Sequence, residues 1–289
     1  MPDTALARHD MAHPEMSLTG VRTIHPSAVV ARGAELGLGV RVGPFCSIGP
    51  NVVIEDGAEL ISHVVVDGHT RIGAGAKLFP FCTVGLAPQD MKYRDEPTRC
   101  EIGMRTQIRE HCTIHRGTAS GRGVTVVGDD CMLMAVAHVA HDCTLGDGVI
   151  IANNAVMGGH VSIGDGAVIG GQSALHQFTR IGRGAMIGGV TGVAADVVPF
   201  GIVFGNRATL TGLNIIGLSR RGYDRAQIHR LRAAFRMLFA GAEIFAARLR
   251  QARAHFSADA LVTEVLDFIE TPSKRGLISA ALAGDSHGA

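Results

Sequence analysis

Residues suited to acid–base chemistry recur along this chain at a spacing of 18. One series consists of His141, Gly159 and Gln177, and a second series beside it contains Asp142 and His160. If the backbone repeats every 18 residues, the members of each series stack at the interstrand spacing of about 4.8 Å. Asp142 faces His141 only if the chain turns a corner between them, because successive strand residues point in opposite directions.

Two more histidines lie next to these series. His138 precedes His141 by three residues, and His176 precedes Gln177. A neutral imidazole titrates near physiological pH and suits a general base, for which His141 is the candidate. The N–H of Gly159, one repeat away, is placed to hold a developing oxyanion. No Ser or Cys follows this spacing beside His141, which favours direct attack by a bound hydroxyl over a covalent enzyme intermediate.

Short strands in a six-residue repeat are the elements that would position these groups. An aliphatic residue or Met recurs at every sixth position from Ile24 to Val193, with an interruption after Val84 and a one-residue slip after Ile114. A period of six fits neither a helix nor a lone alternating strand, but it fits short strands joined by tight turns. Glycine often follows the aliphatic residue directly, where we expect it to supply a positive φ, as at Gly43, Gly49, Gly73, Gly146, Gly164, Gly170 and Gly182.

The residue four positions after each aliphatic is nearly always small. All six cysteines occupy this position, which predicts small buried side chains rather than disulfides or metal ligands, at Cys46, Cys82, Cys100, Cys112, Cys131 and Cys143. A bridge between Cys112 and Cys131 requires the slip to be a simple insertion that leaves them one repeat apart. The lack of a secretion signal argues against such a bridge.

Composition limits the class of protein. Of the 289 residues, 38 are Gly and none is Trp, while 46% are apolar and 18% charged. Disorder is excluded, and a core of small branched side chains is indicated. The net charge of +1 gives no global field for nucleic acid. No apolar stretch is long enough to span a membrane, and the first residues do not resemble a signal peptide, so we expect a cytoplasmic protein.

Three parts are expected along the chain. Residues 1–17 form a disordered extension, 18–200 the repeat domain with loops 85–101 and 115–126, and 201–289 a helical domain. Asp224 is expected to cap one helix, and a second helix is expected from Ser257 to about Glu270. From residue 201 onward, 12 basic residues face 7 acidic ones. This basic surface is either a solvated helix face or a site for phosphates or an acidic carrier protein.

The repeat resembles the hexapeptide-repeat family, whose fold is an all-β solenoid, a left-handed parallel β-helix with three hexads in each triangular coil. A narrower resemblance is to the UDP-N-acetylglucosamine acyltransferases of lipid A biosynthesis. It covers nearly the whole chain from about Ser17, on the motifs QDMKY with EPT (89–98), TIHRGT (113–118), AHVAHDC (137–143), NNA with GGH (153–160), HQF (176–178) and NIIGLSRRG (214–222).

This resemblance implies transfer of a 3-hydroxyacyl chain from acyl carrier protein to the 3-hydroxyl of UDP-N-acetylglucosamine, the first step of lipid A biosynthesis. It implies that His141 is the general base and that the Gly159 amide is the oxyanion donor. A homotrimer is implied, with substrate-binding residues at Asp90, Lys92, His138, Asp142, His160, His176, Gln177, Asn214, Arg220 and Arg221. No cofactor or metal is implied. Gly189 corresponds to the acyl-length position, and Ile216 replaces a residue that is often acidic in the family.

Three alternative functions are weighed against this one. A zinc hydrase similar to the γ-class carbonic anhydrases would use three histidine ligands between subunits, but it gives no role to the lysine loop or the arginine-rich tail. The related UDP-sugar N-acyltransferases carry an additional N-terminal domain, whereas only about 20 residues precede the repeat here. A purely structural β-helix would present uniform faces rather than histidines confined to three coils.

Overall fold

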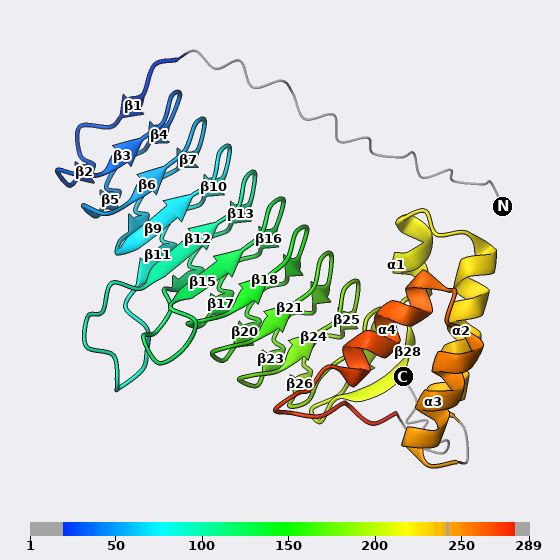
Figure 1. The fold of residues 1–289 in the computed structure, drawn as a ribbon. Coiled ribbons are helices and arrows are strands. Elements are labelled where there is room, and N and C mark those ends of the chain that lie inside the picture. The colour runs from blue at the N-terminus through cyan, green and yellow to red at the C-terminus, as the bar shows by residue number, and fades with distance from the viewer. Residues whose placement is uncertain (1–19, 241–242, 281–289) are drawn as a thin grey trace.

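The backbone of the computed structural model advances in short strands, most of them two residues long, around a triangular prism (Figure 1). The structure describes residues 20–240 and 243–280, so the extension expected at 1–17 lies outside the described residues. The strands form three sheets, here called A, B and C, and successive strands pass from A to B to C. Within a sheet, each strand pairs in parallel with the strand one coil away, for example Thr23 with Arg41.

Each sheet forms one side of the prism. Sheet A contains Thr23–Ile24 (β1), Arg41–Val42 (β4), Glu59–Leu60 (β7), Lys77–Leu78 (β10), Gln107–Ile108 (β13), Met132–Leu133 (β16), Ile150–Ile151 (β19), Val168–Ile169 (β22), Met186–Ile187 (β25), Gly201–Phe204 (β27) and Thr209–Leu213 (β28). Sheet B contains Val29–Val30 (β2), Ser47–Ile48 (β5), Val65–Val66 (β8), Thr83–Leu86 (β11), Thr113–His115 (β14), His138–Val139 (β17), Val156–Met157 (β20), Ala174–Leu175 (β23) and Gly192–Val193 (β26). Sheet C contains Glu35–Leu36 (β3), Val53–Ile54 (β6), His69–Ile72 (β9), Arg99–Ile102 (β12), Val124–Val127 (β15), Thr144–Leu145 (β18), Ser162–Ile163 (β21) and Arg180–Ile181 (β24).

The aliphatic residue of each hexad points into the prism and forms its core. Ile72, Leu78, Ile108 and Ile151 are each 0% exposed, and burying an aliphatic side chain of this size contributes about 1.5–3 kcal/mol. The coils nearest the N-terminal end are less covered: β1 is exposed, and β2 and β3 are only partly buried. The prism is therefore held together by one repeated contact between adjacent coils.

The six cysteines are buried and free, as the spacing predicts. Burial raises the pKa of the Cys112 thiol to about 11, so it stays protonated at neutral pH. The one-coil arrangement considered for Cys112 and Cys131 is wrong, because Cys112 precedes a strand of sheet B and Cys131 precedes a strand of sheet A.

The glycine that follows each aliphatic does not supply a positive φ, contrary to expectation. A Cβ on Gly43 or Gly182 would collide with the backbone of the next coil, and so these positions exclude side chains by close approach. The left-handed residue comes two positions later. It is glycine on the edge between sheets C and A, as at Gly148, but Asp142 (φ 61°) and His160 (φ 63°) on the edge between sheets B and C.

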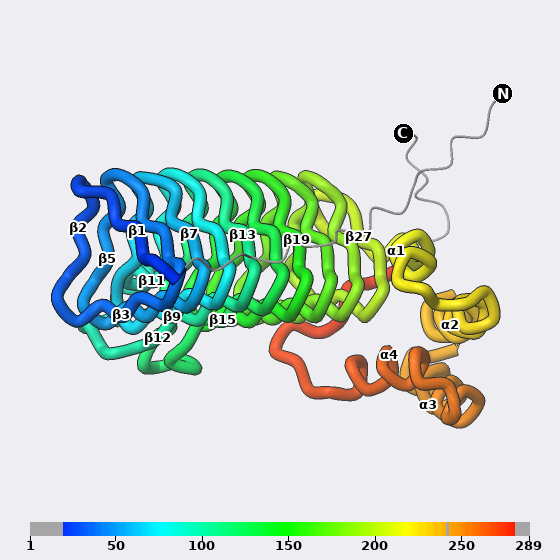
Figure 2. Tube along the Cα trace, turned by 90° about the horizontal axis from the view of Figure 1, so that it is seen from above, coloured from blue at the N-terminus to red at the C-terminus, as the bar shows by residue number. Residues whose placement is uncertain are grey.

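Two loops leave the prism from consecutive coils at this same edge, here called the B–C edge (Figure 2). Thr83 pairs with Thr113, 30 residues later instead of 18, so loop 85–101 adds 12 residues. Thr113 pairs with His138, 25 residues later, so loop 115–126 adds seven. The extra residue beyond a full hexad accounts for the slip in the sequence pattern.

Four helices follow the C-terminal end of the prism: Ile215–Arg220 (α1), Arg225–Phe239 (α2), Phe245–His255 (α3) and Ala260–Glu270 (α4). The cap expected at Asp224 is confirmed, with a full capping box to Gln227. The chain then returns to the prism, where Leu277 bridges to Asp196 and Ala280 to Leu210. Arg183 also joins the prism to α4 by pairing with Glu264.

Candidate active site

The residues expected to do chemistry gather along the B–C edge. His141 and Asp142 form the turn between β17 and β18. Gly159 and His160 form the next turn, between β20 and β21, and the N–H of His160 donates to the His141 carbonyl at 3.0 Å. His176 and Gln177 lie one coil further, between β23 and β24, and are exposed.

Asp142 faces His141 because the chain turns a corner between them. The left-handed φ of Asp142 turns its side chain back toward the imidazole, and His141 Nδ1 lies 2.8 Å from Asp142 Oδ2. Burial opposes ionisation of Asp142, but hydrogen bonds from His141 and Thr118 lower the pKa of the carboxyl to about 2. An ionised carboxylate only accepts hydrogen bonds, so Nδ1 must carry the proton and Nε2 is left as the basic atom.

Gly159 is packed directly against this imidazole. A Cβ at Gly159 would lie 2.5 Å from His141 Cε1 and 2.7 Å from Nε2, so only glycine fits. Its carbonyl accepts the N–H of Phe178 at 3.1 Å. Its own N–H meets no acceptor among the described residues. The basic nitrogen and a free backbone donor therefore lie side by side, which is the arrangement that acyl transfer through an oxyanion requires.

Aromatic and charged groups extend the edge beyond His141. The His160 ring lies edge-on to His141 and stacks on Phe178 with ring centroids 4.4 Å apart. Burial lowers the pKa of His160, while the Asp142 carboxylate acts in the opposite direction. Lys274, in the returning C-terminal segment, places its ammonium 4.2 Å from the Phe178 ring centre. Asp90 influences His160 electrostatically, and Lys92 is exposed in the same loop.

His115 is a neighbour that the residue-level prediction missed, although it lies in the TIHRGT motif. It is 6% exposed and edge-on to His138, at 5.0 Å between ring centres. Burial and the neighbouring His138 lower the pKa of His115 to about 4, and its Nδ1 lacks a hydrogen-bond partner. His138 is itself fixed by Thr113, with Oγ1 2.7 Å from Nδ1. The signal for His115 is its 18-residue-like position one coil before His138, which loop 115–126 disguises.

The remaining predicted residues do not join this cluster. Gly189 lies in the turn between β25 and β26, at the edge between sheets A and B. Asn214 caps α1, accepting the Gly217 N–H and donating to the Gly184 carbonyl. Arg221 donates to the Gly166 carbonyl. Arg220 makes no hydrogen bond or ion pair within the described chain. Asn214 and the two arginines line a cavity of about 780 Å³ over the outer face of sheet A.

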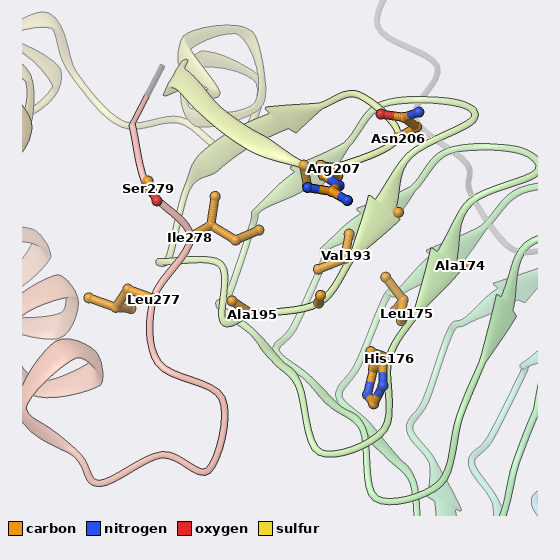
Figure 3. Close-up of a pocket in the computed structure, with 13 residues that line it drawn as sticks. Ala174, Leu175, His176, Val193, Ala195, Asn206, Arg207, Leu277, Ile278 and Ser279 are labelled. Carbon is orange, nitrogen blue, oxygen red and sulfur yellow. The ribbon is translucent and has the colours of Figure 1, made fainter. Parts of the chain in front are cut away.

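A second cavity, of about 520 Å³, lies on the outer face of sheet B near its C-terminal end (Figure 3). Leu175 and Val193 form its floor, and Ile278 from the returning segment and Arg207 border it. His176 is the one predicted site residue in its lining. The larger apolar hollows of the described chain are thus next to the His141 cluster rather than centred on it.

The group best suited to a metal among the described residues is the same cluster. Ligand atoms of His141, Asp142 and His160 lie within 4.8 Å of one another. However, both oxygens of Asp142 already accept protein donors, with Thr118 Oγ1 at 2.6 Å and Gly123 N at 3.1 Å. The carboxylate is arranged to hold a protonated imidazole nitrogen rather than a cation, so the residues do not fit a zinc centre.

Comparison with known proteins places this arrangement in a class. A family model described as bacterial transferase hexapeptide (six repeats) matches residues 124–159. A second, described as UDP-N-acetylglucosamine O-acyltransferase, domain 2, matches residues 196–278. The coils and the helical part thus define a transferase of the hexapeptide-repeat class.

Relatives narrow the class to one family. The acyl-[acyl-carrier-protein]–UDP-N-acetylglucosamine O-acyltransferase of Rhizobium johnstonii is 44% identical over 256 residues, covering 89% of this chain and 94% of that protein. The structure of LpxA from Acinetobacter baumannii matches with a TM-score of 0.85 at 39% identity, over 88% of this chain and 99% of that one. The UDP-N-acetylglucosamine acyltransferase of Francisella novicida matches with a TM-score of 0.86 at 32% identity, over 92% and 100%. This chain belongs to the UDP-N-acetylglucosamine O-acyltransferase family.

The predicted family and the predicted left-handed parallel β-helix with C-terminal helices are therefore confirmed. In the described part of the chain, no helix has the length and apolarity needed to cross a bilayer.

Proposed function

We propose that this enzyme transfers a 3-hydroxyacyl chain from acyl carrier protein to the 3-hydroxyl of UDP-N-acetylglucosamine, with His141 as the general base. This would be the first step of lipid A biosynthesis. The observation that carries the proposal is the contact between His141 and the ionised Asp142, with the free Gly159 N–H beside the ring. The named substrates of the Rhizobium johnstonii relative support the choice of donor and acceptor.

The chemistry follows from these three groups. His141 Nε2 takes the proton of the sugar hydroxyl as its oxygen forms a bond to the thioester carbon. The carbonyl oxygen becomes negative and accepts a hydrogen bond from the Gly159 N–H. When the carbon–sulfur bond breaks, the imidazolium returns its proton to the leaving thiolate. Asp142 remains ionised throughout and stabilises the imidazolium.

The position of the other predicted residues supports a homotrimer. The catalytic groups lie on the B–C edge, whereas the cavity with Arg220 lies over sheet A and Gly189 lies between sheets A and B. For one substrate to reach all of them, sheet A of one copy has to face the B–C edge of another. We propose that each active site forms between two copies, with the nucleotide near Arg220 and the acyl chain near Gly189.

Gly189 supports an open acyl channel. A Cβ built there meets only the Gly171 carbonyl oxygen, at 3.4 Å, which is an ordinary contact. The site therefore has room beside its backbone that a larger residue would fill, and we propose that glycine here permits a longer acyl chain.

The test is to incubate the purified protein with UDP-N-acetylglucosamine, its 3-amino analogue and a series of 3-hydroxyacyl carrier-protein thioesters of increasing length. Mass spectrometry should detect an O-acylated UDP-sugar as the main product. His141→Ala should lower kcat about a hundredfold or more while the protein stays folded. Acylation of the amine alone would contradict the O-transferase proposal, and near-normal turnover by His141→Ala would contradict the role of the base.

A further inference from the structure

Loop 115–126 wraps the carboxylate that orients the proposed base. Thr118 donates its hydroxyl to Asp142 Oδ2 at 2.6 Å, and its backbone N–H lies 3.2 Å from both oxygens. The Gly123 N–H donates to Oδ1 at 3.1 Å. The N–H of Asp142 in turn donates to the Thr125 hydroxyl at 2.8 Å. The loop therefore contributes groups that surround Asp142, although it joins the prism one coil away.

The cradle is closed and dry. Thr118 is 2% exposed and Asp142 is 1% exposed, so solvent cannot replace a lost donor without a rearrangement. Gly121 lies against the carboxylate so closely that a Cβ there would collide with it. The loop itself is held in a tight turn, because Gly121 N and Gly123 N both donate to the Thr118 carbonyl at 3.1 Å.

The shape of this cradle leaves one arrangement for the carboxylate. Three donors of the loop and His141 Nδ1 use the acceptor positions of both oxygens, and a rotated carboxylate would strand at least one donor. A fixed carboxylate fixes the imidazole that bonds to it. The coupling from loop to base thus passes through a single buried side chain.

We propose that Thr118 is a positioning residue for the acyl-transfer reaction, acting through Asp142 to hold His141 in one orientation and one tautomer. The inference rests on the proposed function, because it assigns a role relative to the proposed base. It also gives loop 115–126 a purpose distinct from binding substrate.

The test is a double-mutant cycle between Thr118→Val and Asp142→Asn. Thr118→Val should lower kcat about tenfold to a hundredfold with KM for UDP-N-acetylglucosamine nearly unchanged, since a charged acceptor loses its shortest hydrogen bond. Thr118→Ser keeps the hydroxyl and should restore most of the rate. In the Asp142→Asn background, Thr118→Val should cause no further loss, because its effect passes through the carboxylate. Additive losses in the double variant would overturn the proposal.

A second measurement does not depend on activity. In protein labelled with ¹⁵N-histidine, the downfield Nδ1–H signal of His141 should persist in Thr118→Ser and be lost or broadened in Thr118→Val and Asp142→Asn. Thr106→Val is the matched control, because Thr106 is a buried threonine whose hydroxyl donates to the Gly128 carbonyl at 2.8 Å, away from Asp142. An unchanged signal in Thr118→Val would overturn the positioning role.

The two readouts separate the two proposals. Absence of transfer by the wild-type protein would refute the proposed function, while the histidine signal would still decide whether Thr118 orders the pair. Should Thr118→Val fail to fold, Gly121→Ala presses a methyl group on the same carboxylate and should give the same non-additive loss with Asp142→Asn. Additive behaviour of that variant would count equally against the proposal.

Discussion

At the residue scale, the space beside the His141 ring is as important as the ring itself. Gly159 has no room for a Cβ, and the nearest atoms belong to the imidazole rather than to backbone. We therefore expect Gly159→Ala to push the imidazole aside without unfolding the protein. A displacement of about 1 Å can cost about a hundredfold in rate, and kcat should fall by that order. Steady-state kinetics and circular dichroism measure the two effects.

Gly212→Ala is the control for this variant, because a Cβ at Gly212 has no atom within 4 Å. It should keep both its activity and its thermal stability. Normal turnover by Gly159→Ala would mean that the imidazole does not work from this position.

Asp142 also predicts how stability depends on pH. Its folded pKa of about 2 lies below the ordinary value of 3.8. The folded state therefore binds the proton less readily than the unfolded state, and the stability gained is complete above about pH 4 and lost as the pH falls toward 2. Asp142→Asn should reduce this acid-dependent loss by up to about 2 kcal/mol. Urea unfolding at pH 4.5 and pH 2.5 measures it, and equal losses in both proteins would contradict the shifted pKa.

Residue spacing alone was enough to predict that His141, Gly159 and His160 meet, because the period of 18 transfers directly into stacked coils. The pairing of Asp142 with His141 could not be predicted, since it depends on a left-handed turn that non-glycine residues seldom adopt. Thr118 was equally hidden, because the seven added residues of its loop remove it from the 18-residue register.

At the scale of elements, the helices depend on caps as well as on packing. Asp224 accepts the Gln227 N–H at 2.7 Å, and the Gln227 side chain accepts the Asp224 N–H at 2.9 Å. Asp224→Ala should cost about 1 kcal/mol in the free energy of unfolding. Denaturant unfolding followed by the helical circular-dichroism signal measures this cost.

Arg225→Ala, at the first helical position and outside the cap contacts, should change the free energy by less than about 0.5 kcal/mol. Equal effects of the two substitutions would indicate that the capping box contributes nothing beyond helix propensity.

The elements differ in how well sequence predicts them. Strands of the prism follow from the hexad, and α2 and α4 follow from their apolar faces and caps. The helix α3 went unpredicted, because it has no side-chain cap and buries only Ala252. The role of the glycines was also misjudged: contact between coils, rather than backbone conformation, excludes a side chain at Gly43 and Gly182.

At the scale of the whole molecule, the proposed active site needs groups from two copies. His141→Ala and Arg220→Ala damage opposite sides of that site. Random mixing of the two variants in a trimer should leave about a quarter of the sites with both residues intact, and activity should recover to about that fraction of wild type. Co-expression of differently tagged chains, followed by purification of the mixed species, measures it.

The opposite result has an equally clear meaning. If His141 and Arg220 act within one copy, no mixed site is intact and mixing restores nothing. Failure to recover activity, in mixed species shown to be trimers by mass, would therefore contradict the composite site.

The fixed register of the coils also limits how the family can change length during evolution. Gain or loss of a full coil alters the prism by one step of about 4.8 Å and leaves every side chain on its original face. An insertion of any other length has to leave the prism at an edge, as loops 85–101 and 115–126 do. The distance from His141 to the helical end can therefore change only in whole coils, and single-residue insertions between them cannot gradually tune it.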